Sequence, residues 1–267
     1  DRIESQILTH YPKTLETDLQ IKEQEAEINE AQKEKVEVSD LVKRLIEQVA
    51  FEARESEFVD KKSGVSARLT IAAYENAVSA AERRAIINDE TKTQVWLSDL
   101  SGIIPSITGK IELVYEGEQE GPYQVSYNLL EKAIRTQFKQ YLPDPDTLKK
   151  RKGKEPAAEN PYKTITAWFD KGNALNLFTE TKDDDKVQML YKVSGLHALV
   201  KKHYKDLTEK ETALLMELVL HGLAAHSLIS KKVIDGKIEF KDLMGSMLNM
   251  SSSEHFEEED FNEEDFN

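Results

Sequence analysis

The sequence predicts a mainly α-helical protein, with little strand, that folds as two helical units. Apolar side chains recur every three or four positions over several long stretches, and this spacing places them on one face of a helix. Glycines and prolines separate these stretches, as expected for turns between helices. The 267 residues exceed the size of a single typical domain, so we expect two hydrophobic cores.

The first part of the chain is predicted to form a series of helices. Residues 15–35 are rich in Glu, Lys, Gln and Ala, which are strong helix formers. Ser39 is the predicted N-cap of the next helix, because a serine hydroxyl accepts a hydrogen bond from a first-turn amide. The buried face of that helix is predicted at Leu41, Val42, Leu45, Ile46, Val49 and Ala53.

A third helix follows a glycine turn and has the clearest pattern in the chain. Gly64 breaks the preceding pattern, and Ser66 is the predicted cap of the new helix. Glu75, Glu82 and Arg83 are expected on its outer face. Its buried stripe is predicted at Ile71, Tyr74, Val78, Ala81 and Ala85.

A boundary between the two units is predicted shortly after residue 100. Residues 93–100 are expected to form a fourth helical piece, and Gly102 and Pro105 follow it as breakers. The sequence therefore predicts a first unit of residues 1–102 and a second region of residues 103–250.

The second region combines helices with a linker and one ambiguous stretch. Residues 111–115 alternate like a short strand, either as a connector or as the edge of a hairpin. A helix is expected over residues 123–141, and a linker rich in Pro and Lys follows near 142–161. Another helix, over residues 186–204, is expected to break near Gly195.

The best helix start in the sequence lies in this second region. Thr208 and Glu211 have the spacing of a capping box, in which each side chain satisfies a backbone amide of the other residue. The helix that follows, to about Ile229, is apolar on most faces and is expected at the centre of the second core. A tight turn is predicted at Asp235 and Gly236.

Composition and charge exclude several classes of function. The formal net charge of −14, from 50 acidic and 36 basic residues, disfavours broad contact with a nucleic-acid backbone. There is no cysteine and no apolar run near the roughly 18 residues that cross a bilayer, so we expect a cytoplasmic protein without membrane contact. Residues 251–267 are predicted to form a disordered acidic tail, with a docking peptide for a basic partner as the alternative.

No catalytic or metal-binding motif is evident. The Gly109–Lys110 pair lacks the upstream glycine of a phosphate-binding loop, and Ile111 replaces its required Ser or Thr. His221 and His226 are five residues apart, which rotates them by about 140° on a helix, so they do not form a shared zinc site. No glycine-flanked nucleophilic serine and no identifiable carboxylate pair appears, so the chain alone is expected to be inactive.

Arg68 stands at a position suited to an anion. It follows a glycine turn and lies near the first turn of the third helix. Free amides and the positive end of the helix dipole favour a phosphate there, and a guanidinium adds forked donors that match phosphate oxygens. The alternative is an ordinary surface arginine.

The amino-acid sequence of this region resembles that of a known family. The segment SGVSARLTIAAYENAVSAAERRA resembles the lid of AAA+ ATPases of the magnesium-chelatase-like (MoxR/chelatase) group. Other stretches look like the same group: DRIESQILTHYP, SDLSGIIPSITGKIELVYEGEQEG and ELVLHGLAAHSLISKK. The resemblance implies an AAA+ helical lid bundle over residues 1–102, followed by a second helical region.

The resemblance also implies how nucleotide is handled. Arg68 matches the sensor 2 arginine, which reaches the terminal phosphates of ATP in that family. ATP and Mg²⁺ would be bound mainly by an upstream core with Walker A and Walker B motifs, which this sequence lacks, so the chain that starts at Asp1 is expected to be a carboxy-terminal part. Arg2 is a candidate for a neighbouring subunit's site, and Arg83 and Arg84 are candidates for subunit contacts or for an exposed helix face.

Two functions are consistent with these observations. The first is the lid-containing part of an AAA+ ATPase, which in the complete protein couples ATP binding and hydrolysis to remodelling of a partner or of metal-insertion machinery. By resemblance, its partners would be its own core, neighbouring subunits of a hexameric ring and an unknown protein. The alternative is a non-enzymatic helical interaction module with an acidic recruiting tail.

Overall fold

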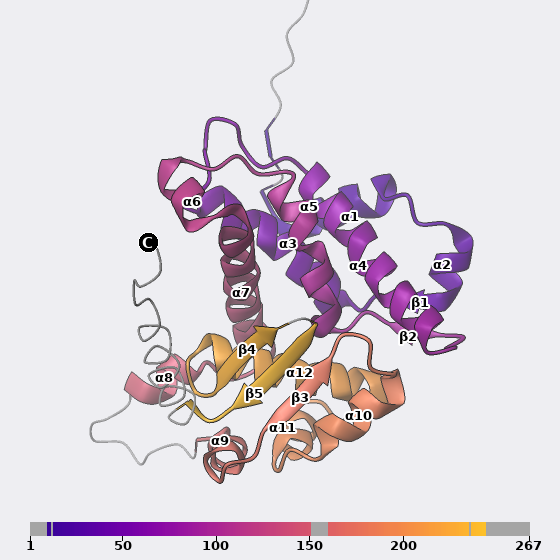
Figure 1. Cartoon of the computed structure of the whole chain (residues 1–267), viewed down its shortest axis with the longest axis vertical. Coiled ribbons are helices and arrows are strands. Elements are labelled where there is room, and N and C mark those ends of the chain that lie inside the picture. Colours follow the sequence, from indigo (N-terminus) through magenta and orange to yellow (C-terminus); the bar gives the residue numbers. More distant parts are fainter. Residues whose placement is uncertain (1–9, 12, 151–159, 235, 244–267) are drawn as a thin grey trace, which may run out of the picture. The chain divides into compact units, whose positions relative to one another are not determined.

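A computed structural model describes residues 10, 11, 13–150, 160–234 and 236–243 (Figure 1). The chain divides into two compact units, and both are mainly helical with small sheets, as the sequence predicted. One unit comprises Asp1–Pro143 with Thr179–Asp183, and the other comprises Asp144–Phe178 with Asp184–Asn267. Among the described residues, no helix is both long and apolar enough to cross a membrane.

The first unit is a helical bundle with one very small parallel sheet. In this sheet Val36 pairs with Thr93 and Glu37 with Gln94. Its elements in chain order are α1 (Leu15–Glu25), α2 (Glu30–Lys35), β1 (Val36–Glu37), α3 (Asp40–Glu55), α4 (Arg68–Ile87), β2 (Thr93–Gln94), the 3₁₀ helix η1 (Leu97–Ile103), α5 (Ile104–Thr108), α6 (Tyr115–Glu120) and α7 (Pro122–Tyr141).

Helix α3 lies at the centre of this unit and forms as predicted. The Ser39 hydroxyl accepts a hydrogen bond from the amide of Val42, and all six apolar positions predicted for its inner face are buried. The helix packs against α1, α4 and α7. The amide of Gln137 on α7 donates to Gln48 at 2.9 Å, and the hydroxyl of Thr136 donates to Glu52 at 2.7 Å. Because α7 packs on α3, the first unit continues well past the boundary expected at residue 102.

Helix α1 contacts α3 through a charged pair rather than an apolar stripe. The ammonium of Lys22 lies 3.0 Å from the carboxylate of Glu47, and both side chains are fully buried. Burial raises the pKa of Glu47, and the charge of Lys22 opposes that rise. The weak apolar periodicity of residues 15–35 therefore reflects a partly polar interface.

Helix α4 confirms the predicted buried stripe only in part, because Val78, Ala81 and Ala85 are buried as expected but the first two predicted positions are not. Ile71 and Tyr74 are only half-buried, and Ser66 does not cap the helix, since Ala67 holds the N-cap position without a side-chain hydrogen bond. Ala73 and Ala77, which were not predicted, are fully buried. The buried positions of α4 are Leu69, Thr70, Ala73, Ala77, Val78, Ala81, Arg84 and Ala85.

Residues 93–115 also differ from the expectation. The predicted helix over 93–100 is a short strand followed by the 3₁₀ helix η1, because the carboxylate of Asp99 accepts a hydrogen bond from the amide of Trp96 and closes a tighter turn. The stretch 111–115 forms only an isolated bridge, Val59 with Leu113, before α6 begins at Tyr115.

Arg84 joins three segments of the first unit inside its core. The sequence placed this residue on an exposed face or at a subunit contact, but only 1% of its surface is exposed. Its guanidinium contacts the carboxylate of Asp183 at 2.6 Å and that of Asp99 at 3.1 Å, and it donates to the hydroxyl of Thr93 at 3.0 Å. The indole of Trp96 donates to the same Asp183 oxygen at 2.8 Å. These two carboxylates, together with that of Glu90 at 3.6 Å, make burial of the guanidinium tolerable.

Replacing Arg84 should destabilise the first unit strongly. Arg84→Met leaves two buried carboxylates without their cation, which costs about 3–5 kcal/mol. Urea unfolding followed by Trp96 fluorescence, in a Trp168→Phe background, reports this unit alone. Arg83→Met is the matched control, because Arg83 on the same helix is exposed and pairs at the surface with Glu180. We expect the control to change stability by less than about 0.5 kcal/mol, and equal effects of the two changes would contradict the prediction.

The second unit combines five helices with a three-stranded antiparallel sheet, counted over the described residues. Strand β5 lies between β3 and β4 in this sheet (Figure 1). Its elements are α8 (Pro145–Lys150), α9 (Lys163–Asp170), β3 (Leu175–Phe178), α10 (Asp183–Tyr191), α11 (Leu196–His203), α12 (Glu209–Ala225), β4 (Ser230–Ile234) and β5 (Lys237–Lys241). Helix α10 begins at Asp183, which itself belongs to the first unit.

Several predicted features of this unit are confirmed. Thr208 and Glu211 form the capping box at the start of α12. Gly195 separates α10 from α11 in the left-handed conformation, with φ of 83°, where a side chain would also strike Thr164. Ile234 pairs with Lys237 on either side of the predicted turn, in which Gly236 has a φ of 74° and Asp235 lies outside the described residues. The predicted linker near 142–161 contains α8, and its residues 151–159 lie outside the described part of the chain.

His221 lies in the core of the second unit. Its ring meets that of Phe240 on β5 edge to face, with 5.2 Å between the centroids, and the ammonium of Lys231 lies 3.4 Å from Nδ1. Burial lowers the pKa of His221 well below its usual range, and the charge of Lys231 lowers it further. The imidazole is therefore neutral in the folded protein at neutral pH.

The second unit should lose stability as the pH falls below about 6.5, the pKa of an unfolded histidine. Below that pH His221 binds a proton in the unfolded chain but stays neutral in the folded protein. The free energy of unfolding therefore falls by up to about 1.4 kcal/mol per pH unit, until the pH reaches the lowered pKa of the folded state. Hydrogen exchange of α12 at pH 7.5 and 5.5 measures this loss. His221→Leu should reduce it, whereas His203→Leu at an exposed position should not. An undiminished loss in His221→Leu would contradict the assignment.

Candidate functional site

Arg68 is the first residue of α4, a helix of 20 residues. Its side chain is exposed, and within the described residues its guanidinium has no carboxylate partner. The N-cap residue Ala67 offers no side-chain acceptor to the first-turn amides. The helix start therefore combines an exposed guanidinium with a positive dipole end that no side chain caps, although the sequence analysis expected Ser66 to cap it. Such a position suits an anion.

A polar cavity of about 220 Å³ is lined in part by Ser66, which is two residues before Arg68 in the sequence. Two chain segments form it, one before α4 and one after α5. Backbone hydrogen bonds fasten them together, from the amide of Asp60 to the carbonyl of Glu112 at 2.8 Å and from the amide of Val114 to the carbonyl of Phe58 at 3.0 Å. The cavity is lined by Ser63, Gly64, Ser66, Gly109, Lys110, Ile111 and Glu112.

Gly64 allows the first of these segments to turn. Its φ of 73° lies in the left-handed region, and a side chain at this position would collide with the hydroxyl of Tyr11. Its amide donates to the carbonyl of Asp60 at 3.2 Å, which closes the turn before α4. The glycine turn identified in the sequence thus shapes both the cavity and the approach to Arg68.

The cavity carries both signs of charge. Lys110 is exposed, and within the described part of the chain its ammonium has no ion-pair partner. Glu112 brings a carboxylate to the lining, and the hydroxyl of Ser63 donates a hydrogen bond to it. An anion would therefore be attracted to the Lys110 and Ser66 side of the lining and repelled by Glu112.

Gly109 and Lys110 do not form a phosphate-binding loop, which agrees with the prediction. Gly109 is the C-cap of α5, and the next helix, α6, begins only at Tyr115. A phosphate-binding loop needs a strand before it and a helix directly after its lysine. Lys110 nevertheless lines the same cavity as Ser66, which is two residues before Arg68. The sequence pattern did not indicate that Lys110 and Ser66 come together.

The remaining arginine candidates are not gathered at this site. Arg83 is exposed and lies 2.8 Å from the carboxylate of Glu180. Arg84 is buried in the core of the first unit. Arg2 and the acidic tail over 251–267 lie outside the described residues. Arg68 is thus the one sequence-predicted site residue that the described structure leaves available for a ligand.

One carboxylate cluster escaped the sequence analysis. His221 and His226 lie in different surroundings, as expected from their spacing, and His221 contacts Lys231. His226 contacts the carboxylate of Asp146, and the carboxylate of Asp144 lies near both. The sequence had indicated no carboxylate pair. The Asp144-Pro145-Asp146 run was the available signal, but its histidine partner is 80 residues away.

Comparisons with known proteins identify no relative. No family model, no curated protein and no solved structure matches the chain. What the chain does is therefore inferred from its own residues and their geometry.

Proposed function

We propose that this chain is the lid-containing carboxy-terminal part of a magnesium-chelatase-like AAA+ ATPase, and that Arg68 binds the terminal phosphates of ATP. The observation that supports this most directly is the environment of Arg68. Among the residues that the structure describes, its exposed guanidinium has no carboxylate partner. It stands on the first residue of a 20-residue helix whose N-cap residue, Ala67, makes no side-chain hydrogen bond.

Physical chemistry favours a phosphate at this position. A guanidinium offers forked N–H donors that match two phosphate oxygens, and such charge-assisted hydrogen bonds are stronger than neutral ones. The positive end of the helix dipole adds to the attraction. Lys110 and Ser66, which is two residues before Arg68, line the polar cavity and provide further groups for an anion or its bridging waters.

The proposed role of Arg68 is to sense the nucleotide rather than to perform the chemistry. ATP and Mg²⁺ would be held mainly by the core of the complete protein. Arg68 would contact the terminal phosphates, so that their loss on hydrolysis changes the angle of the lid. In a ring of such subunits, commonly six in this family, this motion would drive the remodelling of a partner protein or of metal-insertion machinery.

Arg68→Ala in the full-length gene product tests the proposal. We expect ATP turnover to fall on the order of 10- to 100-fold, as for the loss of one charged hydrogen-bonding group. Nucleotide affinity, measured with a fluorescent ATP analogue, should fall by less than about tenfold, because the contact matters most in the transition state. Arg68→Lys keeps the charge but loses the fork, so it should restore turnover only in part.

Arg83→Ala is the matched control, since it removes an exposed arginine from the other end of the same helix. Its turnover should equal that of the parent protein. Equal turnover in Arg68→Ala and the parent would remove the sensor role. No turnover in any of the proteins would favour the alternative, a helical interaction module without nucleotide handling.

A further inference from the structure

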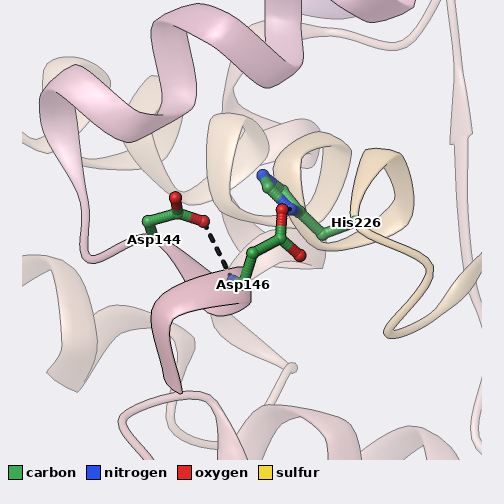
Figure 2. A group of neighbouring side chains, drawn as sticks. All are labelled: Asp144, Asp146 and His226. Carbon is green, nitrogen blue, oxygen red and sulfur yellow. Dashed lines mark hydrogen bonds and ion pairs between the residues drawn. The ribbon is translucent and has the colours of Figure 1, made fainter. Parts of the chain in front are cut away.

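Three side chains able to ligate a metal ion meet within the second unit, where α8 begins and α12 ends (Figure 2). Asp144 and Asp146 flank Pro145, and His226 follows the last residue of α12. One ligand atom from each of the three residues lies within 4.8 Å of those from the other two.

The backbone around Pro145 sets the two carboxylates side by side. A proline ring fixes φ near −65°, which suits the first position of a helical turn. The amide of Asp146 donates to the Asp144 carboxylate at 2.9 Å. The amide and the hydroxyl of Thr147 donate to the carbonyl of Asp144, at 3.2 Å and 2.8 Å. The local chain thus holds the carboxylate of Asp144 in place.

His226 forms the buried side of the cluster. Its side chain has no exposed surface, whereas that of Asp146 is 29% exposed. Nδ1 of the imidazole lies 3.1 Å from the Asp146 carboxylate, and Figure 2 shows the ring directed toward it. The cluster therefore has a fixed inner ligand and an outer edge that solvent reaches, which allows both entry of an ion and completion of its coordination by water.

The electrostatic surroundings favour a cation. The carbonyl end of α12, a helix of 17 residues, carries partial negative charge where His226 stands. The carboxylates of Asp144 and Asp146 add their negative charge beside the imidazole, since the ligand atoms of the three residues lie within 4.8 Å of one another. Two carboxylates and a helix C-terminus thus direct negative potential at the imidazole.

We propose that Asp144, Asp146 and His226 bind a divalent first-row transition-metal ion. One imidazole nitrogen with two carboxylates is a mixed donor set that suits Mn²⁺, Fe²⁺ or Zn²⁺, whereas Mg²⁺ and Ca²⁺ prefer oxygen ligands alone. The ion would join the start of α8 to the end of α12, two segments 80 residues apart in sequence. This site lies in the second unit and does not depend on the proposed role of Arg68.

The simplest competing explanation is a direct ion pair between protonated His226 and Asp146. Both descriptions account for the distance of 3.1 Å. They differ in whether a divalent ion binds, and in whether Asp144 matters, since the ion pair requires only Asp146. Binding measurements on the full chain separate them.

Titration calorimetry with Mn²⁺ and with Zn²⁺ on the full chain tests the proposal, with Mg²⁺ as the comparison ion. We expect one saturable site for a transition-metal ion, and binding at least about tenfold weaker in Asp144→Asn, in Asp146→Asn and in His226→Gln. Asp206→Asn and His203→Gln are the matched controls, because they remove the same kinds of side chain from exposed positions of the same unit. Every protein keeps the acidic tail, so weak binding by its carboxylates is common to all.

Hydrogen exchange provides the second readout. Metal binding should slow exchange at the end of α12 in the parent and in both controls, but not in the three site variants. Asp144→Asn addresses a half-buried side chain, so it keeps the test decisive if His226→Gln fails to fold. Absence of saturable binding at about 1 mM metal, or equal binding by parent, controls and site variants, would overturn the proposal and leave the ion pair.

Discussion

The buried guanidinium of Arg84 is the interaction on which the first unit depends. The guanidinium bonds to Asp99 in η1, to Thr93 in β2 and to Asp183 at the end of the segment Thr179–Asp183, while its own helix crosses the core. A buried arginine is costly unless its donors are satisfied, so the three segments must arrive together. The Arg84 network thereby fixes α4 in place, and the first residue of the same helix is Arg68. The position of the candidate ligand-binding arginine thus depends on a neighbour 16 residues away that contacts no ligand.

Local chemistry explains why much of the fold could be predicted. The Ser39 cap, the inner face of α3, the capping box of Thr208 and Glu211, and the break at Gly195 each arise from residues within a few positions of one another. The failures involve distant partners. Arg84 was assigned to the surface because its two closest carboxylate partners, Asp99 and Asp183, lie 15 and 99 residues away in the sequence. The helix predicted over 93–100 gave way to β2 and η1, where Thr93 and Asp99 hold the same guanidinium.

The candidate sites also differ in whether their residues are close together or far apart in the sequence. Arg68 was identifiable from the sequence because a glycine turn and a helix start are local features, and its role as a phosphate sensor stays a prediction. The polar cavity was not identifiable, since Ser66 and Lys110 come together only through the pairing of two distant segments. The Asp144, Asp146 and His226 cluster was hidden for the same reason, because helical periodicity relates residues three or four apart and says nothing of residues 80 apart.

The path of the chain limits how this protein can be divided. Residues 144–178 belong to the second unit, residues 179–183 return to the first, and the chain then enters the second unit again. A protein cut after Pro143 would keep every helix of the first unit yet lack Asp183, so Arg84 would lose its 2.6 Å partner. Conversely, the second unit expressed from residue 144 onward would carry a segment whose packing partners are gone. Neither unit is therefore a self-sufficient stretch of sequence, and isolated halves would understate the stability of both.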